Sequence, residues 1–491
     1  MFAKITPEAA GISSRHVTKF IKLLERRGLI MHSVLLMRGN DIFGEFYWKP
    51  FDGNFLHRMY SETKSFVGVA VGLLEEDGLV SLDEKISAYF PEKIERELPP
   101  YLAAQTVRDM LTMTTCGDTP NWFKEDETDR TKLYFNSNAA DHPAGMMFKY
   151  DSAGSQVLCA LVEKITGMPL IEFLRERIFK YLGTFDRATI LKTKNDDSWG
   201  DSALLCTTRD MASFARFVMN YGTWEGKRLM NEKYLRTATS RLVDSNRIGF
   251  SDYYTDGYGY QIWRCKDNSF SFNGMGAQLT VCMPDKDLIF VCTAYNYGFE
   301  SAKGLLLSAF FEEIADNVGA PLPEDESAYR ECAELGKSLE LSYLKGPAYS
   351  PFEQEIDGVE YLCEPNPMGI TGFCLAFGTD GTGEFRYTNA QGNKTIRFGL
   401  GRNVFGKFPQ YGYFDLHGGV PTADGFMYGC AASAEWCEER KMHVRVDFVD
   451  NYFGNLFITF SFKEDTALVR MVKHSEACLG EYDGIMIANR K

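Results

Sequence analysis

The stretch from Phe66 to Leu74 consists of small and apolar residues on every side, and charged residues return only at Glu75. Asp77-Gly78 follows it as a helix stop. A helix that is apolar all round has to be covered all round, because no face of it is suited to water. The stretch therefore predicts a helix in the interior of a domain with a sizeable core.

Strand-like segments lie on both sides of this helix in the chain. Residues 33–48 contain two strand-like runs joined by the turn cluster Arg38-Gly39-Asn40-Asp41. Helical patterns follow at about 106–113, 153–166, 170–182 and 208–220, and strand-like runs return at 258–272, 279–283 and 288–295, before a last helix at about 301–316. Strands at both ends of a helical middle predict an α/β domain over residues 1–320, with one mixed sheet covered by helices.

The pattern changes after residue 320. Pro321-Leu322-Pro323 opens a segment, residues 321–350, that we interpret as a linker with a helix at about 328–341. Beyond it the apolar residues Met442, Val444, Val446 and Phe448 alternate with polar ones, and similar short runs recur between glycine-rich turns. Residues 351–491 are therefore expected to form an antiparallel β-barrel domain, with a sandwich as the alternative.

Composition and charge exclude several classes of function. The formal net charge of −14 provides no basic surface for a nucleic acid. No apolar run approaches the roughly 20 residues of a membrane span, and the first residues lack the apolar core of a secretory signal. The 12 cysteines include no Cys-x-x-Cys pair, and the 7 histidines include no His-Glu-x-x-His. We therefore expect a cytoplasmic protein that uses no metal and no cofactor and has neither nucleic acid nor membrane as a partner.

Ser61-Glu62-Thr63-Lys64 leads into the apolar helix and matches Ser-x-x-Lys. On a helix the first and last residues of this pattern lie one turn apart on the same face, so that the lysine amine can reach the serine hydroxyl. Ser342-Tyr343-Leu344-Lys345 matches equally well, but it lies where the chain leaves a helix for a linker. Only Ser61 lies at the start of a buried helix, where the helix dipole favours a developing negative charge.

Several further segments occur in the order of a known family. They are Thr106-Val107-Arg108-Asp109-Met110-Leu111, Pro143-Ala144-Gly145 followed by Tyr150-Asp151-Ser152, a helix ending at Gly167, and Gly274-Met275-Gly276-Ala277-Gln278 before a strand pair. Together with Ser-x-x-Lys, they make residues 5–316 resemble the class C β-lactamase-related serine hydrolases, which include penicillin-binding DD-peptidases, D-amino-acid peptidases and carboxylesterases. The resemblance implies a β-lactamase/penicillin-binding-protein-like mixed antiparallel sheet with helices on both faces.

The resemblance assigns a role to each matching position. It implies that Ser61 is the acylated nucleophile and that Lys64 holds the proton network beside it. Tyr150 matches the tyrosine of the family's Tyr-x-Asn and would act as base. Ser152 stands where the family has asparagine, which leaves a short hydrogen-bonding group for the substrate.

The third family element departs further from the pattern. The family has Lys-x-Gly or His-x-Gly here, whereas this chain has Phe272-Asn273-Gly274. The missing cation argues against substrates with a carboxylate at this place. In this respect the chain resembles the esterase-like members of the family. An alternative register gives Asn273 a polar role, and the backbone N–H of Met275 is the expected second oxyanion donor. The Phe272 and Met275 side chains could equally belong to the core, and Trp122 could line the pocket or pack under a loop.

From these observations we predict an esterase-like serine hydrolase that cleaves a small ester or amide through an acyl-enzyme on Ser61. A D-aminopeptidase or DD-peptidase remains an alternative, as does a binding or sensing protein that has lost its activity. The barrel is expected to resemble a lipocalin, with its lumen filled or facing the mouth of the active site. Self-association into a homo-oligomer stays open.

Overall fold

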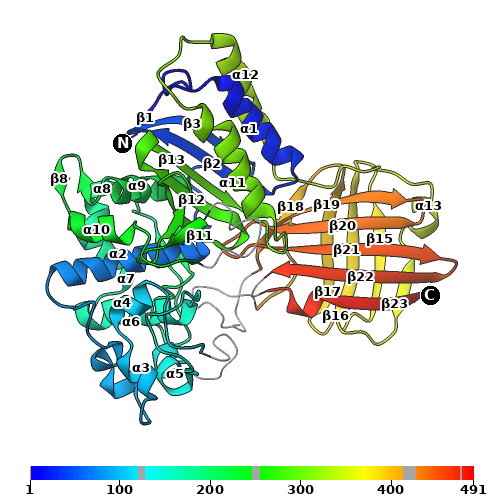
Figure 1. The fold of residues 1–491 in the computed structure, drawn as a ribbon. Helices are drawn as coiled ribbons and strands as arrows, with labels where there is room; N and C mark the ends of the chain where they lie inside the picture. Colours follow the sequence, from blue (N-terminus) through cyan, green and yellow to red (C-terminus); the bar gives the residue numbers. More distant parts are fainter. Residues whose placement is uncertain (1, 120–127, 246–254, 413–426, 476–477) are drawn as a thin grey trace. The chain divides into compact units, whose positions relative to one another are not determined.

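The structure is a computed structural model that describes residues 2–119, 128–245, 255–412, 427–475 and 478–491. The chain divides into two compact units, Met1–Glu340 and Leu341–Lys491 (Figure 1). Among the described residues, no helix combines the length and the apolar character needed to cross a bilayer.

A sheet of eight strands forms the centre of the first unit. Its neighbouring strands are antiparallel, except for β1 and β3, which are parallel. The predicted hairpin at 33–48 is confirmed as β2 and β3, and the strands from the two ends of the unit meet where β2 pairs with β13. In order across the sheet the strands are β1 (Ala3–Lys4), β3 (Asp41–Tyr47), β2 (Met31–Arg38), β13 (Leu288–Ala294), β12 (Gln278–Met283), β11 (Phe270–Gly274), β10 (Trp263–Cys265) and β9 (Thr255–Tyr258).

Helices cover both faces of this sheet, as predicted (Figure 1). Side chains alternate along β2, so that Leu35 packs with helices α2 and α9 while Leu36 packs with α1 and α11. The helices of the unit are α1 (Ser14–Arg26), α2 (Thr63–Glu76), α3 (Pro100–Ala104), α4 (Val107–Leu111), α5 (Arg130–Ser137), α6 (Ser152–Thr166), α7 (Leu170–Leu174), α8 (Lys180–Leu182), α9 (Thr208–Met219), α10 (Glu232–Ala238), α11 (Ala302–Glu313) and α12 (Glu326–Ser338). Small sheets join β4 (His57–Arg58), β6 (Leu204–Cys206) and β5 (Thr189–Ile190), and β7 (Thr223–Trp224) with β8 (Lys227–Arg228).

Helix α2 is buried from Thr63 to Leu74, which confirms the expected interior helix. The ring of Phe66 stacks on that of Phe214 from α9 at a centroid distance of 3.7 Å. Gly72 lets the ring of Tyr234 approach, since a Cβ atom there would lie 2.3 Å from it. The short helical turn η1 (Tyr60–Glu62) leads into α2, so the chain enters the core immediately after Ser61.

Helix α12 lies in the segment that the sequence marked as a linker. It packs on α1, where Arg15 pairs with Asp325 at 3.1 Å and Lys22 pairs with Glu331 at 3.0 Å. This helix therefore adds to the cover of the first unit.

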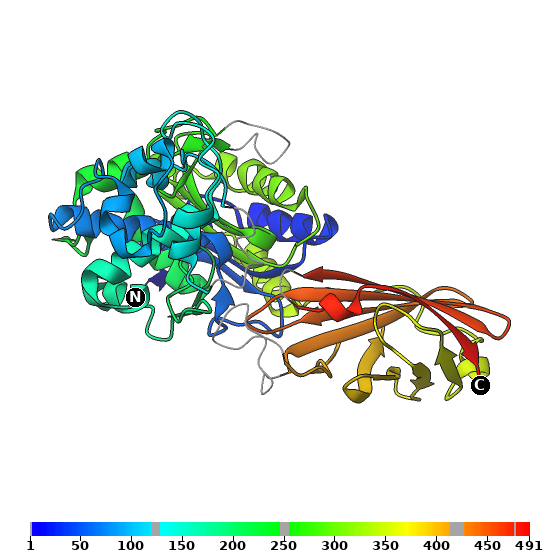
Figure 2. The ribbon, with the colours of Figure 1, turned by 90° about the horizontal axis from the view of Figure 1, so that it is seen from below.

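The second unit is a closed β-barrel, as predicted. Nine strands follow one another in antiparallel pairs from β17 through β16, β15, β14, β23, β22, β21 and β20 to β19. The ring closes where β17 and β19 pair in parallel at Gly399 and Ser433. Figure 1 shows β19 to β22 side by side, and Figure 2 shows them facing the earlier strands of the unit. The elements are α13 (Glu353–Ile356), β14 (Glu360–Cys363), β15 (Gly372–Phe377), β16 (Thr382–Asn389), β17 (Gly392–Leu400), β18 (Val404–Lys407), β19 (Gly429–Glu438), β20 (Lys441–Phe448), β21 (Gly454–Lys463), β22 (Thr466–Ser475) and β23 (Gly484–Arg490).

Aromatic side chains pack across the barrel interior. The ring of Phe385 lies 5.8 Å from that of Phe373 and 5.1 Å from that of Phe460, so that side chains of three strands meet. The buried hydroxyl groups of Tyr387 and Tyr482 hydrogen-bond to each other at 2.8 Å. Side chains therefore fill this part of the lumen.

Candidate active site

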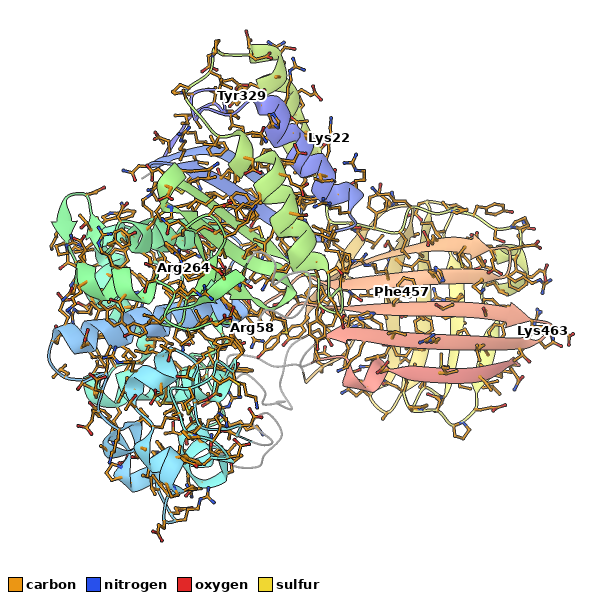
Figure 3. The ribbon with its side chains drawn as sticks, in the orientation of Figure 1. Lys22, Arg58, Arg264, Tyr329, Phe457 and Lys463 are labelled. Carbon is orange, nitrogen blue, oxygen red and sulfur yellow. The ribbon has the colours of Figure 1, made fainter. Side chains whose placement is uncertain are left out.

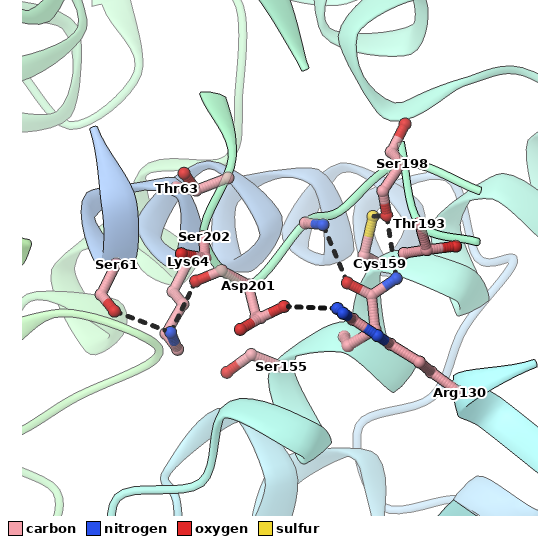
Figure 4. A network of polar contacts seen from close by, with 12 residues as sticks. Ser61, Thr63, Lys64, Arg130, Ser155, Cys159, Thr193, Ser198, Asp201 and Ser202 are labelled. Carbon is pink, nitrogen blue, oxygen red and sulfur yellow. Dashed lines mark hydrogen bonds and ion pairs between the residues drawn. The ribbon is translucent and has the colours of Figure 1, made fainter. Parts of the chain in front are cut away.

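Ser61 and Lys64 lie at the junction of η1 and α2. The Nζ atom of Lys64 donates a hydrogen bond to Oγ of Ser61 at 3.0 Å and another to the backbone carbonyl oxygen of Asp201 at 2.6 Å (Figure 4). Lys64 is only 1% exposed. Tyr60, immediately before the serine, has a φ of 48°, a left-handed conformation that turns the chain into the helix. The structure thus gives a serine hydroxyl with a single amine directed at it.

Tyr150 reaches the same place from the loop before α6. Its ring stacks on that of Trp263, with centroids 5.8 Å apart, and its centre lies 5.0 Å from Nζ of Lys64. Asp151 caps α6 by accepting a hydrogen bond from the N–H of Gly154 at 3.0 Å, and burial raises the pKa of this carboxyl group. The helix cap therefore fixes the end of the loop that carries Tyr150, and the tyrosine lies beside Lys64.

Ser152, the residue that replaces the family asparagine, is the first residue of α6 and is half-buried. One turn later, Oγ of Ser155 donates a hydrogen bond to Oε1 of Gln261 at 2.7 Å. The backbone carbonyl oxygen of Gln261 accepts a hydrogen bond from Oγ of Ser65 on α2, also at 2.7 Å. Gln261 thus ties α6 to α2 behind the site, and no sequence motif marks it.

Strand β11 ends beside η1. A Cβ atom on Gly274 would lie 2.3 Å from the carbonyl oxygen of Met59, so only glycine allows this approach. Met275 follows directly and opens the turn η6 (Met275–Ala277). The side chain of Asn273 is half-buried, and its Oδ1 accepts a hydrogen bond from Oγ of Ser271 at 2.9 Å.

Phe272 lies in the core rather than in the site. Its side chain is 0% exposed, and its ring lies 5.4 Å from that of Phe214 on α9. Neighbouring side chains of a strand point to opposite faces, so Phe272 shares the core face with Phe270 while Ser271 and Asn273 share the other. Its ring therefore cannot contact a substrate. Trp122, the other aromatic residue expected at the pocket, lies outside the described residues.

Two ionisable side chains to which the sequence analysis gave no role, Arg58 and Glu62, are buried near Ser61 in the chain. Arg58 is buried, donates a hydrogen bond from Nε to the carbonyl oxygen of Ser202 at 3.0 Å, and lies 4.5 Å from the centre of the Tyr60 ring. Figure 3 shows it close to the N-terminal end of α2. Burial raises the pKa of Glu62 well above its ordinary value, an effect that contacts with Thr280 partly offset. Burial thus disfavours a charge on the Glu62 carboxyl group, which lies next to Ser61 in the chain.

Within the part of the chain that the structure describes, no group of three or more His, Cys, Asp or Glu side chains could hold a metal ion. The candidate site thus consists of hydroxyl, amine, phenol and backbone groups.

The family and the fold of the chain follow from comparisons with known proteins. The sequence profile of the Beta-lactamase family matches residues 18–302. The 6-aminohexanoate-dimer hydrolase of Paenarthrobacter ureafaciens is 23% identical over 251 residues, which span 48% of this chain and 64% of that protein, just under two thirds of its length.

Solved structures share the fold. A putative 6-aminohexanoate-dimer hydrolase from Bacillus anthracis matches with a TM-score of 0.50 and 17% identity, over 66% of this chain and 88% of its own. A putative β-lactamase from Bacteroides dorei matches with a TM-score of 0.53 and 14% identity, over 62% of this chain and 99% of its own. Homologues with this fold are serine hydrolases such as amidases, esterases and peptidases. Because the family profile covers more than half of the chain, the chain belongs to the β-lactamase family.

Proposed function

We propose that this protein is a serine hydrolase that cleaves a small ester or amide through an acyl-enzyme on Ser61. The observation that carries the proposal is the 3.0 Å hydrogen bond from Nζ of Lys64 to Oγ of Ser61. A buried lysine is costly, and a role in activating the hydroxyl accounts for its place in an apolar helix.

The proposed reaction has two steps. In the first, Oγ of Ser61 attacks the substrate carbonyl carbon, its proton passes to the phenolate of Tyr150, and the leaving group takes that proton as the carbonyl–oxygen or carbonyl–nitrogen bond breaks. In the second, water gives a proton to the same base and attacks the carbonyl carbon of the acyl-enzyme. The bond from that carbon to Oγ of Ser61 then breaks, the base passes its proton to Oγ, and the acid is released. The ammonium of Lys64 would stabilise the phenolate, and the backbone N–H groups of Ser61 and Met275 would bind the oxyanion.

The substrate class follows from the third element of the site. The family pattern has a cation at the position of Phe272, whereas here the position holds a phenylalanine whose ring is buried against Phe214 and offers a substrate carboxylate no partner. The Tyr150 ring lies beside Lys64 and stacks on that of Trp263. These features favour a substrate with an apolar group near the scissile bond and support the esterase-like assignment.

Hydrolysis of an amide, as by a D-aminopeptidase or DD-peptidase, is the second candidate. A relative named a 6-aminohexanoate-dimer hydrolase favours it. A preference for a free amino group beside the scissile bond would distinguish a D-aminopeptidase from an esterase.

The test compares wild type, Ser61→Ala and Ser342→Ala on p-nitrophenyl acyl esters and D-amino-acid anilides. Ser342 is the matched control because it also opens a Ser-x-x-Lys sequence. We expect Ser61→Ala to lose on the order of a thousandfold in kcat and Ser342→Ala to lose nothing. Intact-mass analysis should find one fluorophosphonate on Ser61. Equal turnover by wild type and Ser61→Ala would refute the proposal, and a protein without turnover or labelling would favour the lost-activity alternative.

A further inference from the structure

One residue contacts both Lys64 and a second cation. The backbone carbonyl oxygen of Asp201 accepts the 2.6 Å hydrogen bond from Nζ of Lys64, while its carboxylate Oδ1 lies 3.7 Å from Nη1 of Arg130 (Figure 4). Arg130 is the first residue of α5, far from Lys64 in sequence. The carbonyl that holds the lysine thus belongs to a residue whose side chain is paired elsewhere.

Two arginines and a glutamine fix the segment that carries Asp201. The guanidinium groups of Arg58 and Arg130 each lie 4.6 Å from the centre of the Trp199 ring. The N–H of Gly200 donates a hydrogen bond to Oε1 of Gln156 at 2.9 Å. A Cβ atom on Gly200 would lie 2.3 Å from Sγ of a cysteine on α6, so the segment packs tightly there.

Because the pair of Arg130 and Asp201 is buried, the position of Asp201 depends on the charge of Arg130. The Asp201 side chain is 1% exposed and that of Arg130 is 13% exposed. A carboxylate in this position is costly without an opposite charge, so loss of the guanidinium would drive Asp201 towards water. Because its side chain and its carbonyl share one residue, that movement would shift the acceptor away from Lys64.

We propose that Arg130 is a positioning residue of this active site. Through the Asp201 carboxylate and the Trp199 ring, it keeps the Asp201 carbonyl on Nζ of Lys64 and thereby keeps the amine directed at Ser61. The proposal rests on the acyl-enzyme function proposed above. Arg130 does not itself touch the reacting atoms.

The experiment compares Arg130→Gln and Arg130→Lys with Arg236→Gln. Arg236 is a matched control on α10, since it pairs with Glu232 at 2.7 Å and lies 3.9 Å from the centre of the Tyr221 ring. Values of kcat and KM are measured on a p-nitrophenyl ester, together with the rate of labelling by a fluorophosphonate. We expect Arg130→Gln to lose between about tenfold and a hundredfold in kcat and in labelling rate with little change in KM. Arg130→Lys should recover part of the loss, and Arg236→Gln should behave as wild type.

A second variant, Asp201→Asn, covers the case in which Arg130→Gln does not fold, and the two substitutions together give a double-mutant cycle. Asp201→Asn keeps the backbone carbonyl and removes the charge, so it should lose kcat at unchanged KM. Where both single variants fold, the double variant should lose no more than the worse of them. Wild-type kcat in Arg130→Gln or in Asp201→Asn, a loss in KM alone, or additive losses would overturn the proposal.

Ser61→Ala, measured alongside, separates the two proposals. If Ser61→Ala keeps full turnover, the acyl-enzyme function fails. If Ser61→Ala is inactive while Arg130→Gln is as active as wild type, only the positioning role fails.

Discussion

The Nζ atom of Lys64 lies 3.0 Å from Oγ of Ser61, and the lysine is covered almost completely by the protein. Ser61 lies in η1 and Lys64 in the first turn of α2, a helix that is apolar from Phe66 to Leu74. Burial of the lysine amine costs free energy of folding, while the amine is needed beside Ser61 for activity. Replacement of Lys64 by an apolar residue should therefore lower activity without lowering stability.

Replacing Lys64 by methionine tests this opposition. Methionine has a similar length and no charge, so Lys64→Met should keep or raise the melting temperature. Its kcat should fall by on the order of a thousandfold, because no amine remains beside Ser61. Activity assays and thermal melts check both expectations, with the exposed-lysine variant Lys180→Met as control. An active Lys64→Met protein would contradict the assignment.

Tyr150→Phe separates the ring of this residue from its hydroxyl. The phenyl ring can keep the stack on Trp263 and the contact with Lys64, so the fold should be unchanged. Loss of the proton acceptor should lower kcat by about 10²- to 10⁴-fold. Tyr181→Phe is the matched control, since Nζ of Lys227 lies 3.8 Å from the centre of that ring. If the two variants have the same kcat, Tyr150 is not the base.

Local sequence signals predicted most of the first unit. A capping box of Thr106 and Asp109 starts α4, within the helical pattern predicted at about 106–113. Gly167 ends α6 in the left-handed conformation, where the sequence predicted a helix end, and Gly183 ends α8 in the same way. The segment before Gly183 is less regular than predicted, since a π-helical turn at Arg175–Phe179 separates α7 from α8.

Other features depend on contacts between distant segments and could not be predicted. The inward direction of Phe272 follows from the register of β11 against β12, which no motif determines. Arg130, at the start of α5, and Asp201 are far apart in sequence, and neither lies in a recognisable pattern. The parallel pairing of β17 with β19 that closes the barrel likewise has no signal in the alternation of either strand.

Gly274→Ala tests whether the close approach of β11 matters for activity. The added methyl group would lie 2.3 Å from the carbonyl oxygen of Met59, so β11 has to move away from η1. This movement would displace the N–H of Met275 from the oxyanion, and kcat should fall by about a hundredfold. Gly319→Ala is the control, because a Cβ atom there meets nothing within 4 Å. Full activity of Gly274→Ala would exclude β11 as the source of an oxyanion donor.

Glu45 links the stability of the first unit to pH. Its carboxylate accepts hydrogen bonds from Nε and Nη2 of Arg209 at 2.6 and 2.8 Å and pairs with Lys4 at 2.7 Å. Burial alone would raise its pKa, but the hydrogen bonds from Arg209 and Lys4 outweigh burial and lower the pKa to about 2. In the unfolded chain this carboxyl group has its ordinary pKa of about 4.5, so the stabilisation is complete above that pH and is lost as the pH falls towards 2.

Glu45→Gln should therefore reduce the free energy of unfolding by about 3 kcal/mol at pH 7, and the difference from wild type should shrink between pH 4.5 and 2. Urea unfolding followed by tryptophan fluorescence checks this, because Trp436 is the only one of the 6 tryptophans in the second unit. Glu176→Gln removes an exposed pair with Lys180 and should change the free energy of unfolding little at any pH. A deficit of Glu45→Gln that stays constant from pH 7 to pH 3 would mean that packing, rather than the charge of Glu45, provides the stabilisation.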